Sequence, residues 1–139
     1  MTSDDRGTSR AARAERRPMS RLRPLSQFGR RVEVLYVEDA AGLRPHVIAA
    51  LDASRFHVVV AAGTHAAQFH CQRDRFEVVL CGTTSTARAL WEFLAATRTR
   101  VLVASEGEPD ATLPPNVSMI GAPESAGALR DAVLASARR

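Results

Sequence analysis

The stretch that decides the fold is Val32-Glu33-Val34-Leu35-Tyr36-Val37, which is followed directly by Glu38-Asp39. The run is apolar except for Glu33, which is typical of a strand covered on both faces of a sheet. The two carboxylates come at the carboxyl end of that strand, where they would form a compact negative pocket. Oxygen ligands of this kind suit Mg²⁺, which keeps several waters in its coordination shell. The stretch therefore predicts a buried strand with a candidate cation site at its end.

The hydrophobic pattern along the rest of the chain alternates between short apolar runs and segments with helical spacing. Strands that alternate with helices favour right-handed crossovers and a parallel sheet. We therefore predict an α/β fold, a flavodoxin-like doubly wound five-stranded parallel sheet with strand order 2-1-3-4-5 and a shortened helix between strands 4 and 5. The predicted strands are residues 32–37, 56–62, 76–81, 101–104 and 117–120, and the predicted helices are residues 43–51, 65–72, 83–97 and 125–138.

Proline and capping residues locate the helix ends. Pro45 lies in the first turn of the helix at residues 43–51, because proline is tolerated there and not in a helix interior. The spacing places Ile48 on the apolar face of this helix. N-caps of the later helices are predicted at Thr64, at one of Thr83, Thr84 and Ser85, and at Ser125.

Charge divides the chain into two parts. Residues 1–31 hold nine arginines and three acids, a balance of +6, whereas residues 32–139 hold ten arginines and twelve acids, a balance of −2. We therefore predict a disordered arginine-rich N-terminal tail at residues 1–31 and one folded domain at residues 32–139. Such a tail can contact nucleic acid through counterion release. The other interpretation is a solvated leader that results from a start codon upstream of Met19.

The apolar content of the chain argues against a membrane protein. There is no run of about 18 apolar residues, and no apolar segment follows the first arginines, so neither a membrane span nor a secretory signal is predicted. We expect a cytoplasmic location. Cys71 and Cys81 are too few for a disulfide framework and are interpreted as small buried or partly buried thiols.

The predicted strand order gathers polar and small residues at one edge of the sheet. Ligands of this fold bind outside the carboxyl ends of the strands, where the strand order reverses. The residues that come to this crevice are Glu38, Asp39, Gly82, Ser105 and Ala122.

Several strings along the chain resemble the receiver domain of two-component response regulators. Residues 34–39 are similar to the family's first strand and its acidic, Mg²⁺-binding pair, and residues 76–82 resemble its third strand. Residues 101–105 look like the fourth strand with its switch hydroxyl, here Ser105. Ala122-Pro123 resembles the lysine-proline step before the last helix. The resemblance covers about residues 32–138 and implies a CheY-like fold and a role in phosphorelay signalling.

Two positions depart from the family's pattern. Gly82 stands where the resemblance places the phosphoacceptor aspartate, and Ala122 stands where it places a lysine. Aspartyl phosphorylation needs a carboxylate nucleophile and positive charge on the phosphoryl oxygens. We therefore expect no enzymatic activity and no cofactor, and at most weak or vestigial Mg²⁺ binding by Glu38 and Asp39.

These expectations combine into one functional hypothesis and two alternatives. The hypothesis is a stand-alone atypical receiver domain, a pseudo-receiver, that acts in bacterial two-component signalling by phosphorylation-independent protein–protein interaction. Its partner would be a histidine kinase or another regulator, bound through the last helix and the face of strands four and five, and a homodimer is an open alternative there. The rival hypothesis is a nucleic-acid-associated protein that uses the arginine-rich tail. A small enzyme on the same fold is disfavoured. The sequence names neither the partner nor the pathway.

Overall fold

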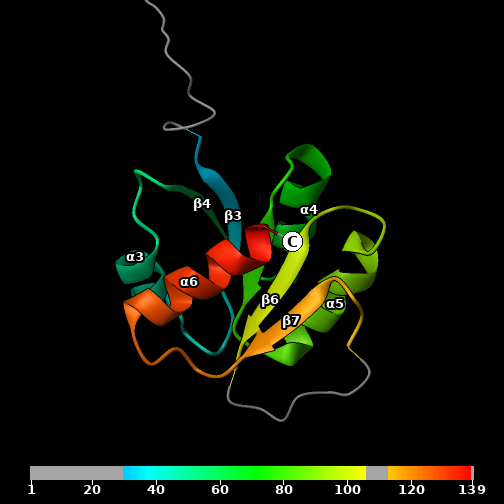
Figure 1. Cartoon of the computed structure of the whole chain (residues 1–139). Coiled ribbons are helices and arrows are strands. Elements are labelled where there is room, and N and C mark those ends of the chain that lie inside the picture. The colour runs from blue at the N-terminus through cyan, green and yellow to red at the C-terminus, as the bar shows by residue number, and fades with distance from the viewer. Residues whose placement is uncertain (1–29, 106–112, 139) are drawn as a thin grey trace, which may run out of the picture. The chain divides into compact units, whose positions relative to one another are not determined.

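The computed structural model of the chain describes residues 30–105 and 113–138. From Val32 onward the chain forms one compact unit of alternating strands and helices (Figure 1). Its elements are, in order, β3 (Val32–Val37), α3 (Arg44–Ala50), β4 (Phe56–Ala61), α4 (Thr64–Arg73), β5 (Val78–Cys81), α5 (Thr84–Leu94), β6 (Arg100–Ala104), β7 (Val117–Ile120) and α6 (Ala126–Ala137).

The five strands form one parallel sheet in the order β4-β3-β5-β6-β7. The predicted fold class and the strand order 2-1-3-4-5 are therefore confirmed. β3 lies between β4 and β5, with Val34 opposite Val58 on one side and Val78 on the other. A strand in this position is covered on both faces, which explains why its sequence is a nearly continuous apolar run. The predicted short helix before β7 falls mainly on residues 106–112, which lie outside the described residues.

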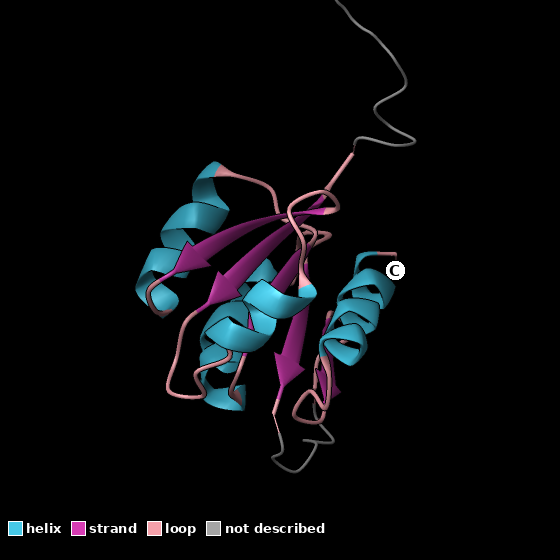
Figure 2. Ribbon diagram, turned by 90° about the vertical axis from the view of Figure 1, so that its left-hand side faces the viewer, coloured by secondary structure: helices cyan, strands magenta, loops and turns pink. Residues whose placement is uncertain are grey.

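Helices cover both faces of the sheet (Figure 2). On one face, α4 and α5 pack through Ala67, Leu90 and Trp91 onto side chains of the inner strands. On the other face, α3 and α6 pack through Val47 and Leu129 onto a second set of strand side chains. Alternate residues of each strand thus belong to different cores, because successive side chains of a strand point to opposite faces.

The helix starts show which local predictions were right. Pro45 lies in the first turn of α3, as predicted. The hydroxyl of Thr83 accepts a hydrogen bond from the amide of Thr86, 3.1 Å away, so Thr83 is the cap among the three candidates. Ser125 caps α6 in the same way, through the amide of Ala128 at 3.1 Å. Both caps satisfy amides that the first helical turn leaves without partners.

Two local predictions were wrong. Thr64 is not a cap: it is the first residue of α4, and the cap position is taken by Gly63, whose φ of 103° favours glycine. Ile48 is not on the buried face of α3, because its side chain is 71% exposed. The neighbouring residue Val47 is buried, and one step along a helix turns a side chain by roughly 100°. Sequence spacing alone did not show how narrow the buried face of this short helix is.

A hydrogen bond ties the last helix to the first. The guanidinium of Arg130 on α6 donates through Nε to the carbonyl oxygen of Ala50, 3.0 Å away, at the end of α3. The last carbonyls of a helix lack intrahelical partners and carry partial negative charge, so an arginine is well suited to this position. The bond fixes how the two helices lie side by side on their face of the sheet.

Candidate functional site at the carboxyl edge of the sheet

All five candidate residues lie at or just beyond the carboxyl ends of strands. Glu38 and Asp39 follow β3, Gly82 follows β5, Ser105 follows β6 and Ala122 follows β7 at a distance of two residues. In a parallel sheet these ends share one edge, which is the edge where ligands of this fold bind. The hydrogen bonds and close contacts at this edge show which of these five residues interact with one another.

Both oxygens of the Asp39 carboxylate accept hydrogen bonds from the protein itself. Its Oδ1 accepts from the amide of Ala41 at 3.0 Å. Its Oδ2 accepts from the amide of Gly82 at 3.1 Å and from the Thr83 hydroxyl at 3.4 Å. Asp39 therefore joins the turn after β3 to the start of α5. Bonds to a charged acceptor are stronger than neutral ones, so this link stabilises both loops.

Gly82 is buried beneath this link, and a side chain there would collide with its neighbours unless they moved. A Cβ atom added to Gly82 would lie 2.5 Å from Cβ of Ala41, 2.8 Å from Oδ1 of Asp39 and 3.3 Å from Cδ1 of Leu43. Two of these distances are shorter than van der Waals contact allows. The glycine is thus required by the close approach of the turn after β3 and not by an unusual backbone angle. The space that a side chain would occupy at the end of β5 is filled.

Glu38 is directed to a different partner. Its two carboxylate oxygens receive a bidentate pair of hydrogen bonds from Arg44, with Nε 2.7 Å from Oε2 and Nη2 2.9 Å from Oε1. The hydrogen bond that Arg44 donates to Glu38 raises the pKa of Arg44 above its ordinary value, and the charge of Glu38 adds to this effect. The two adjacent carboxylates therefore do not share one pocket. Arg44 neutralises the carboxylate of Glu38, whereas the carboxylate of Asp39 accepts hydrogen bonds from the turn after β3 and from the start of α5.

Ser105 and Ala122 lie on the far side of this edge, toward β7. The backbone amide of Ser105 donates to the carbonyl of Ile120 at 3.1 Å, which extends the pairing of β6 with β7 by one residue. Ser105 is half-buried, and Ala122 is exposed. Ala122 carries no polar atom in its side chain, so it adds no charge to the edge.

The resemblance implies a divalent cation at this edge, but the residues present do not fit one. A hard cation such as Mg²⁺ needs several carboxylate or carbonyl oxygens with free lone-pair directions. Both oxygens of Asp39 accept from donors of the protein, and both oxygens of Glu38 accept from Arg44. Within residues 30–105 and 113–138 no group of three or more His, Cys, Asp or Glu side chains is placed to hold a metal ion.

Two buried groups next to the edge are chemically quiet. Burial raises the pKa of the Cys81 thiol well above its ordinary value, and the charge of Asp39 and then the nearby Cys71 add to the shift. Burial is also the first cause of the raised pKa of Tyr36, followed by the charge of Asp39. A thiol that stays protonated is a poor nucleophile. Neither group is poised for catalysis.

Sequence reasoning missed two of the residues that shape this edge. Arg44 was not assigned a role, although it lies six residues after Glu38 and is brought back by the tight turn that contains Gly42 at φ 65°. Ala41 was missed as well, because its part is played by its backbone amide and its Cβ. Thr83 was found, but only as a helix cap. Its second bond to Asp39 depends on the sheet order and is not visible in the local sequence.

The fold is that of a receiver-like α/β domain, and comparison with known proteins agrees at the level of fold. No protein-family model and no curated protein matches the chain. The crystal structure of a response regulator receiver domain protein from Bacillus halodurans C-125 is similar, with a TM-score of 0.58 and 17% sequence identity. The match covers 77% of this chain and 97% of that chain. At this identity the likeness shows the fold alone.

The described helices are all too short or too polar to pass through a lipid bilayer.

Proposed function

We propose that the chain is an atypical receiver domain that works in bacterial signalling by binding a protein partner without accepting a phosphoryl group. The observation that carries this proposal is the filled space above Gly82. Where the resemblance expects a phosphoacceptor carboxylate, there is a glycine, and the side chain of Asp39 and the Ala41 turn occupy the volume that a larger residue would need.

The chemistry of phosphoryl transfer supports the proposal. An acceptor must offer a carboxylate oxygen that can reach the phosphorus atom. Asp39 is the acid that contacts Gly82 among the residues that the structure describes, and both of its oxygens already accept hydrogen bonds. Charge on the transferred group must also be stabilised by a cation. Position 122 is alanine, and the guanidinium of Arg44 is paired with Glu38.

The proposed output is docking through α6 and the neighbouring strands β6 and β7. A histidine kinase or another regulator is the kind of partner that this hypothesis implies, and a second copy of the chain is the alternative. The hydrogen bond from Arg130 to Ala50 supports a docking role, because it ties α6 to α3 and so restrains the proposed docking helix. A rigid surface loses less conformational entropy when it binds.

Intact-mass measurement after incubation with acetyl phosphate and Mg²⁺ tests the proposal. We expect no added phosphoryl group, whereas a typical receiver domain treated in parallel should be labelled. The variant Asp39→Asn is the matched control, because it removes the one carboxylate next to Gly82 and keeps its shape. An acid-labile phosphoryl group on the wild-type chain that is lost in Asp39→Asn would overturn the proposal.

A further inference from the structure

β4 is an edge strand whose outer side has no neighbouring strand within residues 30–105 and 113–138. Its inner side pairs with β3 over its full length, from Phe56 to Ala61, and the register shows no bulge. The strand contains no proline and no lysine, arginine, aspartate or glutamate. Such residues, or a bulge, commonly keep an edge strand from pairing with another chain. β4 therefore lacks the common protections of an edge.

The backbone of β4 offers hydrogen-bonding groups on this outer side. The carbonyl oxygens of Arg55 and Ala61 accept bonds at 2.8 Å from amides of the β3 segment, so these two residues face inward. Successive residues of a strand direct their amide and carbonyl groups to alternate sides. Val58 and Val60 therefore direct theirs outward, where no described strand pairs with them. These two residues give two donors and two acceptors that a second strand would satisfy.

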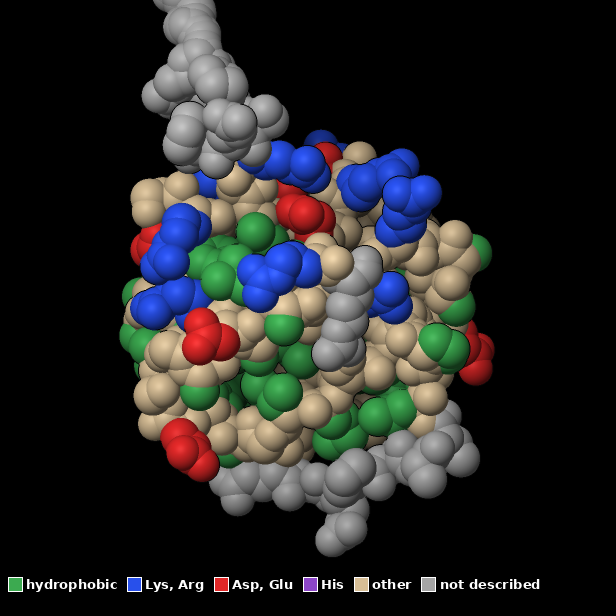
Figure 3. All heavy atoms as spheres, in the orientation of Figure 1, with side chains coloured by type: hydrophobic (Ala, Val, Ile, Leu, Met, Phe, Trp, Pro, Cys, Tyr) green, Lys and Arg blue, Asp and Glu red, His purple; other side chains and the backbone are tan. Residues whose placement is uncertain are grey.

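Apolar side chains are exposed beside this edge. Val60 is 42% exposed, and Ile48 on α3 is 71% exposed. Figure 3 shows hydrophobic side chains at the surface over α3. Ala50 is fully buried and its carbonyl contacts α6, whereas Ile48 lies two residues earlier, a rotation of roughly 200° about the helix. Because α6 lies over β5 and β6, Ile48 points toward the β4 end of the sheet.

A second copy of the chain fits this edge in one symmetric register. Two β4 strands can pair in antiparallel fashion about a twofold axis at Val59. Val58 of each copy then lies opposite Val60 of the other, and the two residues exchange both hydrogen bonds. An axis at Val58 would need the amide of Phe56, which already donates to the carbonyl of Asp52 at 2.9 Å. An axis at Val60 would extend the pairing beyond the end of β4.

The side chains of the strand suit this register. Residues 58–60 are all valine, so each of them meets a valine of the other copy. Pairs of β-branched side chains across antiparallel strands stabilise a sheet. His57 would lie opposite Ala61, and the carboxylate that His57 contacts at 2.6 Å, that of Glu33, belongs to its own copy. No like charges therefore face each other across the new strand pair.

We infer that the chain forms a homodimer in which the β4 strands of two copies pair in antiparallel fashion and join the two sheets into one. The assembly closes at two copies, because the twofold axis uses β4 of both. The interface lies at the opposite end of the sheet from β7, so it leaves α6, β6 and β7 free for the partner of the proposed receiver function. The inference goes beyond that function and does not depend on it.

Sedimentation velocity of the full chain over a range of concentrations tests the inference. We expect a dimer that dissociates on dilution. Val60→Lys places a charge beside the twofold axis in both copies, and it should give a monomer at concentrations at which the wild type is a dimer. Phe93→Lys is the matched control and should stay dimeric, because Phe93 is 41% exposed, like Val60 at 42%, but lies on α5.

A cysteine cross-link tests the register without disrupting the dimer. In this register the two copies of Val59 form a pair without mutual hydrogen bonds, whose Cα atoms lie roughly 4.5 Å apart, a separation that a disulfide can bridge. Val59→Cys should therefore give a covalent dimer under mild oxidation. The wild type, whose Cys81 is buried and Cys71 half-buried, and the control Phe93→Cys should not. Circular dichroism checks that each variant is folded.

Three results would overturn the inference. One is a monomeric wild type at every concentration up to its solubility limit, which would leave the β4 edge to a strand of another protein. Another is a dimer that a folded Val60→Lys variant still forms, which would place the contact on a different face. The third is the absence of a cross-link in Val59→Cys at concentrations at which the wild type is a dimer. If Val60→Lys does not fold, the cross-link alone decides.

Discussion

Gly82 is the residue whose replacement most directly tests the packing at the carboxyl edge. We predict that Gly82→Ala lowers the free energy of unfolding by about 1 to 3 kcal/mol, because the new methyl group must displace Ala41 and Asp39. Urea denaturation followed through the fluorescence of Trp91, the one tryptophan of the chain, would measure the change. Gly121→Ala is the control, since a Cβ there meets no atom within 4 Å. Equal stability of the two variants would show that the turn after β3 yields easily.

Asp52 gives a prediction for the dependence of stability on pH. Hydrogen bonds from Arg55 and then from Ser54 lower the pKa of Asp52 well below its ordinary value in the folded state. A carboxyl group with a depressed folded-state pKa contributes stability above its unfolded pKa, near 3.9, and loses it as the pH falls toward the folded value. Asp52→Asn should therefore flatten the loss of stability below about pH 4 in urea titrations. A parallel pH profile for variant and wild type would contradict this.

At the scale of single residues, the sequence predicted which positions reach the carboxyl edge but not how they are used there. Glu38 and Asp39 were expected to form one pocket, and the structure directs them to separate partners, Arg44 and Gly82. The contact between Glu38 and Arg44 is not evident from the sequence, because it depends on the turn between them that brings Arg44 back toward Glu38. The second contact joins residues 43 positions apart and depends on which strands are neighbours.

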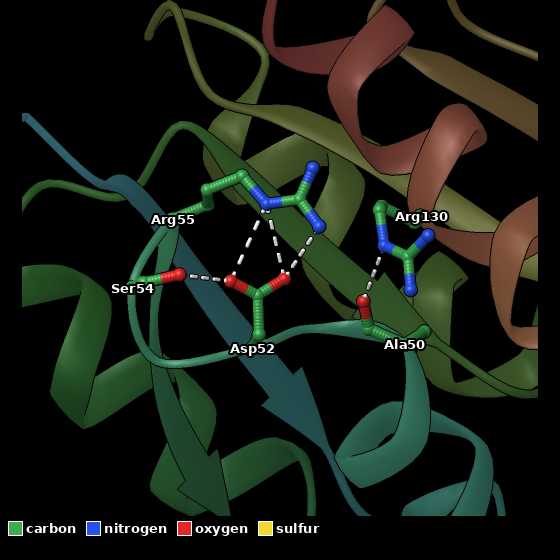
Figure 4. A network of polar contacts seen from close by, with 5 residues as sticks. All are labelled: Ala50, Asp52, Ser54, Arg55 and Arg130. Carbon is green, nitrogen blue, oxygen red and sulfur yellow. Dashed lines mark hydrogen bonds and ion pairs between the residues drawn. The ribbon is translucent and has the colours of Figure 1, made fainter. Parts of the chain in front are cut away.

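At the scale of elements, the bond from α6 to α3 makes the position of the last helix sensitive to one side chain. Arg130→Ala should lower the free energy of unfolding by about 1 kcal/mol, because the terminal carbonyl of Ala50 loses a charged donor (Figure 4). Arg138→Ala removes a charge from the end of the same helix and serves as control, with an expected change within about 0.5 kcal/mol. Urea denaturation of both variants measures the difference, and a larger loss in Arg138→Ala would reverse the assignment.

The elements themselves were largely predictable, because their signals are local. Apolar runs located the strands, with Val117–Ile120 matched at both ends, and Thr83 and Ser125 were right as caps. The errors arose where tertiary packing decides. Thr64 is a good capping residue by type, but α4 already begins at Thr64. The cap position falls on Gly63, which has a positive φ. The spacing of Ile48 fits a broad apolar face of the helix, but only a narrow face of α3, which includes Val47, is buried.

At the scale of the whole molecule, the two cysteines report on global opening. Cys81 has no exposed surface, and burial raises the pKa of Cys71 to about 11. At pH 8 roughly one Cys71 thiol in a thousand is ionised at that pKa, so both should react slowly with iodoacetamide in the folded protein. We predict slow single labelling at Cys71 and labelling of Cys81 only at the rate of global unfolding. Mass spectrometry with and without urea measures this, and rapid double labelling without urea would contradict it.

The topology of the whole molecule followed from the sequence because alternating strands and helices leave few ways to build a sheet. The strand order was confirmed in full. The boundary predicted at residue 32, the character of the tail and the cytoplasmic location remain predictions.

The crowding around Gly82 also bears on how this domain can evolve. One nucleotide change is enough to turn a glycine codon into one for aspartate, so descendants that carry an acid at this position must arise often. The side chain of an acid at position 82 would collide with Ala41 and would lie against the negative charge of Asp39. Any lineage that acquired a functional acid there would first have to reshape the neighbouring turn, and this requirement means that selection disfavours a single substitution at position 82.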